Sequence, residues 1–255
     1  MAIDGLRMER DGGVLRITFD RPDRLNSLTA EIIHAAAEAI EAADDNGVRV
    51  IVLTGSGRAF SSGADVGPDG APPGLDTLDA ANRMTMAITH SPVVVVAAVN
   101  GVAAGVGCSF AVAADLAIAK ESASFMLAFT KIGLMPDGGA SLLVTAAVGR
   151  ARAARMALLA EKVGARTAAE WGLIADVVSD DDFESHVDDR VAQLAAGPPL
   201  AYAATKRTLN AASLSLLEAI LREERDGQGP LLASADFAEG MAAFQAKRPA
   251  VFTGS

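Results

Sequence analysis

Two glycine-rich segments are the part of this sequence best suited to chemistry. The first reads AFSSGAD (residues 59–65) and the second NGVAAGVGC (residues 100–108). Each follows an apolar run, residues 48–54 and 93–99, that is typical of a buried strand. The ends of two neighbouring strands can present backbone N–H groups to one point in space. Two convergent N–H groups are what the oxygen of a thioester enolate needs for stabilisation.

A single carboxylate, Asp137, is the second candidate for chemistry. It lies in the sequence MPDGG (residues 135–139), at the start of an apolar stretch that predicts a helix. Pro-Asp-Gly alone is more typical of a turn or a helix N-cap than of a catalytic site. In an apolar pocket, however, desolvation would raise the pKa of this carboxyl. A raised pKa suits a group that takes up a proton and returns it.

These segments, in this order and at this spacing, resemble the crotonase superfamily, which is the enoyl-CoA hydratase/isomerase family. The resemblance covers almost the whole chain. It includes the further sequences RP (21–22) with NSL (26–28), IGLMPDGG (132–139), WGLI (171–174), and EGM (239–241) with Phe244, Lys247, Arg248 and Pro249. It implies an α/β fold, a crotonase-like spiral of ββα units, followed by a C-terminal helical trimerisation segment. It also implies an acyl-CoA thioester as substrate and a homotrimer or a dimer of trimers.

The same resemblance assigns the chemical roles. The two oxyanion-hole N–H groups would be those of Ala64 and Val106, and the base would be Asp137. The hydratase pattern needs two glutamates, but the corresponding positions hold Ser109 and Phe129. This departure favours double-bond isomerisation, in which one base moves a proton between two carbons, over the addition of water. No metal or organic cofactor is expected, since coenzyme A is part of the substrate.

Further substrate contacts are implied along the glycine segments and near the C-terminus. The residues are Ser62, Gly63, Asp65, Gly105, Ser109, Phe129, Arg24, Phe244 and Lys247. Phe244 and Lys247 match positions that contact the CoA nucleotide, whereas Arg24 could meet its phosphates. For Asp65, hydrogen bonding to nearby backbone groups is the more frequent role, and for Ser109 it is hydrogen bonding to the backbone of its own helix. Phe129 belongs either to the acyl pocket or to the core, and a lone basic residue is more often a solvated surface charge.

Three alternatives to isomerisation stay open. The first is an enoyl-CoA hydratase in which Asp137 activates the water. The second is another reaction on the same scaffold, such as acyl-CoA hydrolysis, decarboxylation or ring chemistry. The third is a non-catalytic acyl-CoA-binding protein that has lost both glutamates.

Composition limits the remaining function classes. With 255 residues, of which 51% are hydrophobic, the chain suits one large domain or a core with an appendage. No apolar run reaches the roughly 18 residues of a membrane span, and no secretory signal is visible. The single Cys108 fits a cytoplasmic location and is expected to be a packing residue. The net charge of −10, without a basic stripe, argues against nucleic acid as a partner.

Hydrophobic periodicity predicts alternating strands and helices, which indicates an α/β fold. Strands are expected over residues 14–19, 48–53, 93–99, 115–119 and 124–127, and helices over 28–43, 76–90 and 104–114. Thr29 is the expected N-cap of the first helix. Residues 67–74 contain three prolines and three glycines and are expected to form a loop.

The pattern changes after residue 180. Helices are expected over residues 181–196, 199–212 and 214–225, and another within 228–252 before an irregular end. We therefore expect a spiral core with the acyl-CoA site over residues 1–195 and a C-terminal helical segment over residues 196–255.

Overall fold

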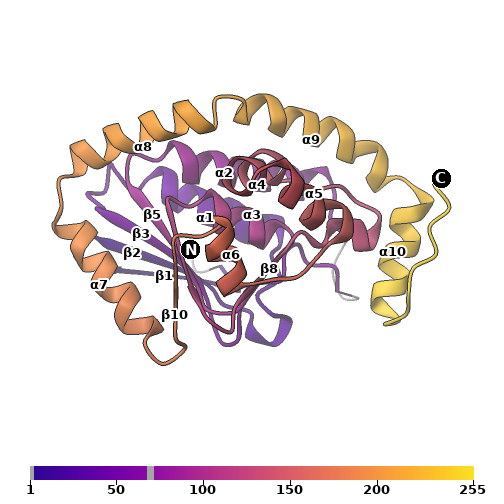
Figure 1. Ribbon diagram of the computed structural model, residues 1–255, viewed down its shortest axis with the longest axis horizontal. Helices are drawn as coiled ribbons and strands as arrows, with labels where there is room; N and C mark the ends of the chain where they lie inside the picture. Colours follow the sequence, from indigo (N-terminus) through magenta and orange to yellow (C-terminus); the bar gives the residue numbers. More distant parts are fainter. Residues whose placement is uncertain (1–2, 68–71) are drawn as a thin grey trace.

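The computed structural model describes residues 3–67 and 72–255 and contains two β-sheets with helices packed around them (Figure 1). The larger sheet has the strand order β1-β2-β3-β5-β7-β10 and is parallel except for the β1–β2 pair. Its strands are β1 (Leu6–Asp11), β2 (Val14–Phe19), β3 (Val50–Gly55), β5 (Val94–Val99), β7 (Leu116–Lys120) and β10 (Asp176–Val178). The smaller sheet consists of β4 (Ala59–Ser61), β6 (Val102–Ala104), β8 (Ser124–Met126) and β9 (Val163–Gly164).

Successive strands alternate between the two sheets, and this alternation produces a spiral. β3, β5 and β7 lie in the larger sheet, and the strand that follows each of them, β4, β6 or β8, lies in the smaller one. A helix follows β4 and another follows β6, so the repeating unit is ββα. The expected fold class is therefore confirmed.

The helices fall into a group around the spiral and a C-terminal group. The first group is α1 (Ala30–Glu41), α2 (Leu75–His90), α3 (Val106–Ala113), α4 (Ala140–Val148), α5 (Arg150–Leu159), α6 (Ala165–Trp171) and the short 3-10 helices η1 (Pro22–Arg24) and η2 (Ala128–Ile132). The second group is α7 (Phe183–Ala196), α8 (Pro199–Ser213), α9 (Leu217–Leu232) and α10 (Ala235–Gln245). None of the helices in the described part of the chain is long and apolar enough to cross a membrane.

Both faces of the larger sheet are buried. Ile51 and Leu53 of β3 face the main core, to which α1, α2 and α3 contribute. Val50 and Val52 face the opposite side, where they pack with Phe183 of α7. A strand covered on both faces must be apolar throughout, and residues 50–53 have that composition.

Several expected elements differ from those observed at their ends. α1 begins as expected, because Thr29 Oγ1 accepts a hydrogen bond of 3.3 Å from the N–H of Ile32. The helix expected from residue 104 begins at Val106, since residues 102–104 pair with β4 and β8 as a strand. The helix expected to end at residue 225 continues to Leu232, although it contains Pro230. Tertiary contacts of its last turns outweigh the low helix propensity of proline. Residues 68–71 of the expected loop lie outside the described residues.

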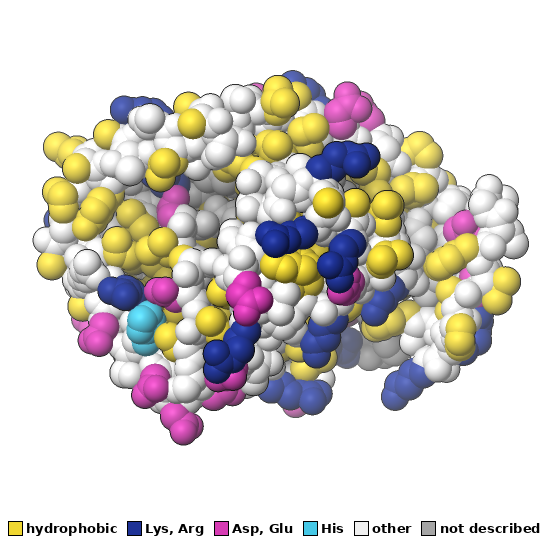
Figure 2. Space-filling view, viewed as in Figure 1, with side chains coloured by type: hydrophobic (Ala, Val, Ile, Leu, Met, Phe, Trp, Pro, Cys, Tyr) yellow, Lys and Arg dark blue, Asp and Glu magenta, His cyan; other side chains and the backbone are white. Residues whose placement is uncertain are grey.

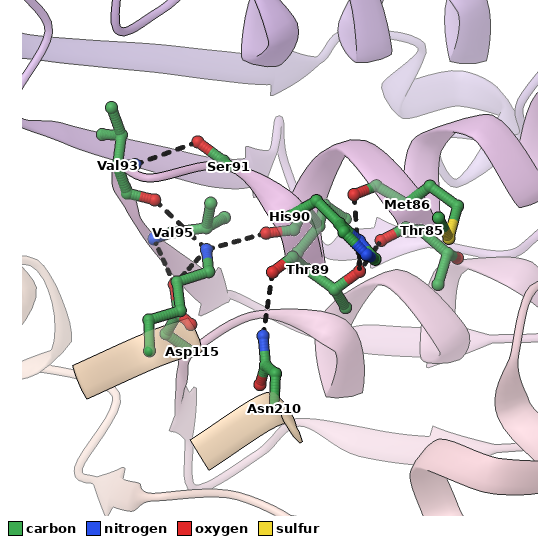
Figure 3. A network of polar contacts seen from close by, with 11 residues as sticks. Thr85, Met86, Thr89, His90, Ser91, Val93, Val95, Asp115 and Asn210 are labelled. Carbon is green, nitrogen blue, oxygen red and sulfur yellow. Dashed lines mark hydrogen bonds and ion pairs between the residues drawn. The ribbon is translucent and has the colours of Figure 1, made fainter. Parts of the chain in front are cut away.

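The C-terminal helices form an arm over the spiral. In Figure 1, α8 and α9 run along the top of the molecule and α10 descends at the right. α8 is attached through Lys206, whose Nζ lies 2.7 Å from Asp115 Oδ2 and donates to the carbonyl oxygens of Ile88 and Val93. Figure 3 shows this network together with Asn210, which donates to the carbonyl of Thr89 at 2.8 Å.

The Lys206–Asp115 pair is an ion pair taken almost completely out of water. The side chain of Lys206 is 5% exposed and that of Asp115 19%. Burial lowers the pKa of Lys206 and raises the pKa of Asp115, and their mutual attraction opposes both shifts. Asp115 Oδ2 also accepts a hydrogen bond from the N–H of Val95, so the pair joins α8 to β5.

Candidate active site

Two buried asparagines position the first glycine segment. Asn26 Nδ2 donates to the carbonyl of Ala59 at 2.7 Å, and Asn100 Nδ2 donates to the carbonyl of Gly57 at 2.9 Å. Asn100 Oδ1 accepts the N–H of Gly55 in return. Asn26 belongs to the NSL sequence and Asn100 begins the second glycine segment, so both motifs fix the turn between β3 and β4.

The loops after β4 and β6 approach each other through two glycines with positive φ. The φ angle is 96° at Gly63 and 53° at Gly105. A Cβ atom on Gly63 would lie 2.9 Å from the carbonyl oxygen of Ala104 and 3.5 Å from the nitrogen of Val106. Only glycine fits such a close approach with this backbone conformation.

The amides of Ala64 and Val106 are the two free donors at this contact. Leu28 donates to the carbonyl of Gly63, and its own carbonyl accepts the N–H of Asp65, so the intervening amide of Ala64 points away from Leu28. Val106 is the first residue of α3, where backbone N–H groups lack helical partners. Neither amide donates a hydrogen bond to another group within residues 3–67 and 72–255. Together they can bind an oxygen atom that gains negative charge.

A cavity of about 350 Å³ opens at these two amides. Its wall is mainly apolar and comes from the two glycine loops, α2, η2, α9 and α10. The residues are Leu25, Ser62, Gly63, Ala64, Val66, Pro73, Gly74, Thr77, Leu78, Ala81, Val102, Ala104, Gly105, Val106, Met126, Ala128, Phe129, Lys131, Ile132, Leu134, Asp137, Gln228, Leu232 and Phe244. Asp137 is the only carboxylic acid among these described lining residues. The cavity therefore combines an apolar wall, two backbone donors and one acid.

The environment of Asp137 raises the pKa of its carboxyl well above the ordinary value. Burial raises the pKa of this carboxyl to about 7. A hydrogen bond of 2.9 Å from Gln228 Nε2 to Oδ2 opposes the shift, and the nearby carboxyl of Glu224 adds to it. A carboxyl with such a pKa is present in both protonation states at neutral pH, as proton transfer in both directions requires.

The loop that carries Asp137 is attached to three helices. Ser109 Oγ of α3 donates to the carbonyl of Asp137 at 2.9 Å, and Thr85 Oγ1 of α2 donates to the carbonyl of Gly138 at 2.7 Å. From α9, the buried Glu224 accepts the N–H groups of Gly139 and Ser141 at 2.7 and 2.9 Å. Glu224 thus caps the N-terminus of α4, and Asp137 lies before the cap residue, Gly139. The N-cap interpretation of Asp137 is therefore wrong.

The structure brings most of the residues implied by the resemblance to this cavity. Those that line it are Asp137, Ala64, Val106, Ser62, Gly63, Gly105, Phe129 and Phe244. Phe129 is 8% exposed and also packs in the main core. It therefore belongs both to the cavity wall and to the core, which were expected as alternatives. Asp65, Ser109, Arg24 and Lys247 are not among the lining residues.

These four residues lie around the cavity. Asp65 Oδ2 forms an ion pair of 2.8 Å with Arg21, and Oδ1 accepts the N–H of Gly67. Burial raises the pKa of Asp65, but these hydrogen bonds outweigh it and lower the pKa overall. Ser109 bonds to the Asp137 loop rather than to its own helix, which corrects the expectation of bonding within that helix. Arg24 and Lys247 are exposed.

α10 brings Phe244 to the cavity through close packing on η2. A Cβ atom on Gly240 would lie 2.6 Å from the Cα of Ile132, so only glycine allows this contact. Arg248 then forms a bidentate pair with Glu239, and hydrogen bonds from Arg248 and Val251 lower the pKa of Glu239 to about 2. These contacts account for Glu239 and Gly240 of the EGM sequence and for Arg248 beyond it.

Three residues near the cavity have no counterpart among the sequence-based candidates. Gln228 and Lys131 line it, and Glu224 supports its acidic loop. Glu224 and Gln228 are four residues apart on α9 and therefore share a helix face. The continuous helix over residues 217–232 places them together, whereas the expected helices assigned them to two separate segments, 214–225 and 228–252. Cys108 is fully buried, and burial raises the pKa of its thiol to about 12, as expected of a packing residue.

Known proteins are similar to this chain in sequence and in fold. Residues 9–255 match the family described as enoyl-CoA hydratase/isomerase. The chain is 49% identical over 259 residues to a probable enoyl-CoA hydratase of Rhodobacter capsulatus, with 100% of both chains covered. It is 39% identical over 250 residues to the 1,2-epoxyphenylacetyl-CoA isomerase of Escherichia coli, with 95% of each covered.

A solved structure agrees over the same length. The crystal structure of an enoyl-CoA hydratase from Mycobacterium avium subsp. paratuberculosis superposes with a TM-score of 0.94 at 49% identity, covering 99% of this chain and 100% of the other. On the family match, these identities and the ββα spiral, the chain belongs to the enoyl-CoA hydratase/isomerase family, the crotonase superfamily.

Proposed function

We propose that this protein isomerises the double bond of an enoyl-CoA, with Asp137 as the base. The observation that carries the proposal is the single acid in the cavity. Asp137 is the only carboxylic acid among the described lining residues, and its pKa is raised to about 7. One base is sufficient for moving a proton from one carbon to another.

The proposed reaction starts from a 3-enoyl-CoA. The thioester oxygen accepts hydrogen bonds from the N–H groups of Ala64 and Val106. The carboxylate of Asp137 removes a proton from C2, and the resulting dienolate carries its negative charge on the thioester oxygen between these donors. Asp137 then returns the proton to C4, which gives the conjugated 2-enoyl-CoA. The step is neutral in redox terms and consumes no co-reactant, so we propose that no added cofactor is needed.

The rest of coenzyme A would leave the cavity past η2 and α10. Lys131 and Phe244 line the cavity there, and Phe244 is 57% exposed. An aromatic ring can stack on the adenine, and Lys131, Arg24 and Lys247 could meet phosphate charges. The net charge of the protein is −10, so attraction of the anionic CoA depends on such local groups.

Hydration of a 2-enoyl-CoA is the second candidate, because the Rhodobacter and Mycobacterium relatives are named hydratases. Against it, Ser109 and Phe129 stand at the two glutamate positions, and neither can activate water. Only Asp137 could take that role. The Escherichia coli relative acts as a 1,2-epoxyphenylacetyl-CoA isomerase, which adds ring-containing thioesters to the substrates to be tested.

A paired ultraviolet assay of the wild-type protein separates the two candidates. One sample starts from a 3-enoyl-CoA and the other from a trans-2-enoyl-CoA, and the products are identified by mass spectrometry. Absorbance of the conjugated thioester growing in the first sample supports isomerisation. Absorbance falling in the second, with formation of a 3-hydroxyacyl-CoA, supports hydration. If both thioesters bind but neither is converted, and ring-containing thioesters are not converted either, the result supports a non-catalytic acyl-CoA-binding protein.

We also propose a homotrimer, or a dimer of trimers, assembled through the C-terminal arm in the cytoplasm. α8 and the turn after it expose three leucines, Leu200, Leu209 and Leu216, at 85%, 63% and 60%. Figure 2 shows hydrophobic side chains along the upper edge of the molecule, where Figure 1 places α8 and α9. Sedimentation equilibrium would measure the mass, and a monomer would exclude this assembly.

A further inference from the structure

Every polar atom of the Gln228 side chain has a partner in the Asp137 loop. Nε2 donates to Asp137 Oδ2 and to the carbonyl of Met135, both at 2.9 Å. Oε1 accepts the N–H of Met135 at 3.0 Å. Because the N–H of Met135 must face an oxygen, the amide can have only one orientation, with its NH₂ group toward Asp137. The residue is 1% exposed, so water cannot replace these contacts easily.

This arrangement makes the two oxygens of Asp137 different. Oδ2 accepts the hydrogen bond from Gln228, whereas Oδ1 receives no hydrogen bond from the described residues. A carboxylic acid accepts a hydrogen bond better through its carbonyl oxygen than through its hydroxyl oxygen. The bond from Nε2 therefore favours the neutral acid with its proton on Oδ1 and with Oδ2 accepting as the carbonyl oxygen.

From these contacts we propose that Gln228 is a positioning residue for the base: it binds Oδ2 of Asp137 and reserves Oδ1 for the proton that moves between the two carbons of the substrate. The inference rests on the proposed function, because it presupposes that Asp137 is the base. It explains why an amide, and not a second carboxyl, occupies this position of α9.

Charged groups around Asp137 fix the direction in which a variant would change its titration. Burial and the carboxyl of Glu224 raise the pKa of Asp137, and the Gln228 hydrogen bond lowers it. Lys131 lines the same cavity. Removing the amide donor takes away the Gln228 hydrogen bond, while burial and Glu224 continue to favour the neutral acid. Lys131 is present in both the wild type and the variant, so it does not contribute to the difference between them. The pKa of Asp137 must then rise.

Two variants test this role, with a matched surface control. Gln228→Met removes all hydrogen bonds and keeps the length of the side chain. Gln228→Glu keeps an acceptor for the N–H of Met135 but places a second carboxyl beside Asp137. Gln193→Met on α7 is the control, since Gln193 is an exposed glutamine distant from the cavity in sequence and fold.

The first measurement is the pH dependence of kcat/KM with a 3-enoyl-CoA. The rise in activity that follows ionisation of Asp137 should move upward by about one pH unit in Gln228→Met. At pH 7 this corresponds to roughly fivefold lower kcat/KM, recovered at pH 9. In Gln228→Glu the shift should be larger, because two adjacent carboxyls share a proton. Gln193→Met should retain the wild-type profile.

The second measurement does not depend on turnover. Infrared difference spectra of the substrate-free protein, with Asp137→Asn as the blank, follow the carboxyl band of Asp137 through its titration. The same upward shift is expected there. If Asp137→Asn keeps full activity, the proposed function fails, yet the spectra still report whether Gln228 controls Asp137.

A purely structural Gln228 would give a different result. Its variants would have a lower Tm but the wild-type pH profile and the wild-type carboxyl titration, and this result would overturn the inference. If Gln228→Met does not fold, Gln228→Glu, which keeps the acceptor for Met135, provides the same two measurements.

Discussion

The hydroxyl of Ser109 donates a hydrogen bond of 2.9 Å to the main-chain carbonyl of Asp137. Ser109 belongs to the helix whose first amide, that of Val106, faces the cavity, so this bond joins one proposed oxyanion donor to the proposed base. A Cβ atom on Gly138 would lie 3.3 Å from the Cβ of Ser109, which shows how closely the two segments pack. Ser109 occupies one of the two positions at which the hydratase pattern has a glutamate. In this chain the residue at that position therefore holds the Asp137 loop.

Ser109→Ala should impair both stability and turnover. The substitution removes the shorter of two hydrogen bonds to the carbonyl of Asp137, which then keeps only the N–H of Ala140 at 3.3 Å, at a cost of about 1 kcal/mol in the free energy of unfolding. Loss of the bond also frees the Asp137 loop, so kcat should fall while binding of a CoA ester persists. Urea unfolding and initial rates measure the two effects.

The control for this variant is Ser185→Ala. Ser185 Oγ also donates to a main-chain carbonyl at 2.9 Å, that of Asp182, but at an exposed position of α7. Its loss should leave kcat unchanged. Equal effects of the two substitutions on kcat would contradict a specific link between Ser109 and Asp137.

Asp137→Asn should stabilise the protein at neutral pH. The pKa of Asp137 is raised in the folded state, to about 7 from an ordinary value of 3.8, so the folded protein binds more protons than the unfolded chain between these values. Stability contributed by the neutral acid is present at low pH and is lost as pH rises toward 7. Asparagine can still accept the Gln228 hydrogen bond through its oxygen and carries no charge.

The expected gain of Asp137→Asn over the wild type grows from near zero at pH 4 to between about 1 and 4 kcal/mol at pH 7.5. Urea unfolding at several pH values measures it. A constant difference between the two proteins across this range would mean that the carboxyl of Asp137 titrates normally.

Gly63→Ala should reduce kcat strongly, because its new Cβ atom would push against the carbonyl of Ala104 and displace the amide of Ala64. Loss of one oxyanion donor lowers kcat by roughly 10²-fold or more. Gly12→Ala is the matched control, since Gly12 also has a positive φ, 54°, but nothing lies within 4 Å of its Cβ position. Steady-state kinetics of both variants separate crowding at the site from backbone strain alone. Similar kcat values for the two would argue against a role for the amide of Ala64.

Lys206→Met should destabilise the attachment of the C-terminal arm. The substitution leaves the carboxyl of Asp115 buried without its cation, and breaking such a pair costs about 3 kcal/mol or more. The exposed Lys162 offers a control, because Lys162→Met removes a charge from the surface. Thermal unfolding should show a lower Tm for Lys206→Met alone. An unchanged Tm would show that neither the ion pair nor the hydrogen bonds of Lys206 to the carbonyls of Ile88 and Val93 are needed to hold α8 in place.

Much of the spiral could be predicted from local patterns in the sequence. β2, β3 and β5 are apolar or alternating runs, and Thr29 caps α1 as its residue type suggests. β4 and β9, with three and two residues, have no counterpart among the expected strands, because they are too short for periodicity to reveal them. They form because they pair with neighbours distant in the sequence.

The site, like the fold, has residues that local sequence patterns indicate and residues that only distant contacts bring into place. Ala64, Val106 and Asp137 lie in glycine motifs, and glycine marks close approaches of the backbone that a sequence reveals directly. The support for Asp137 comes from Gln228 and Glu224 on α9, more than eighty residues later in the chain. A buried glutamine has no local sequence signal, because its partners are main-chain atoms of a distant loop.

The most direct test is the rate at which the conjugated thioester forms from a 3-enoyl-CoA, compared between the wild type and Asp137→Asn at pH 7.5. Binding of a CoA ester is measured in parallel, to show that the cavity is intact in the variant. We predict that formation of the 2-enoyl-CoA is abolished in Asp137→Asn while the Kd for the ester remains close to that of the wild type. Near-normal turnover by Asp137→Asn would contradict the assignment of Asp137 as the base.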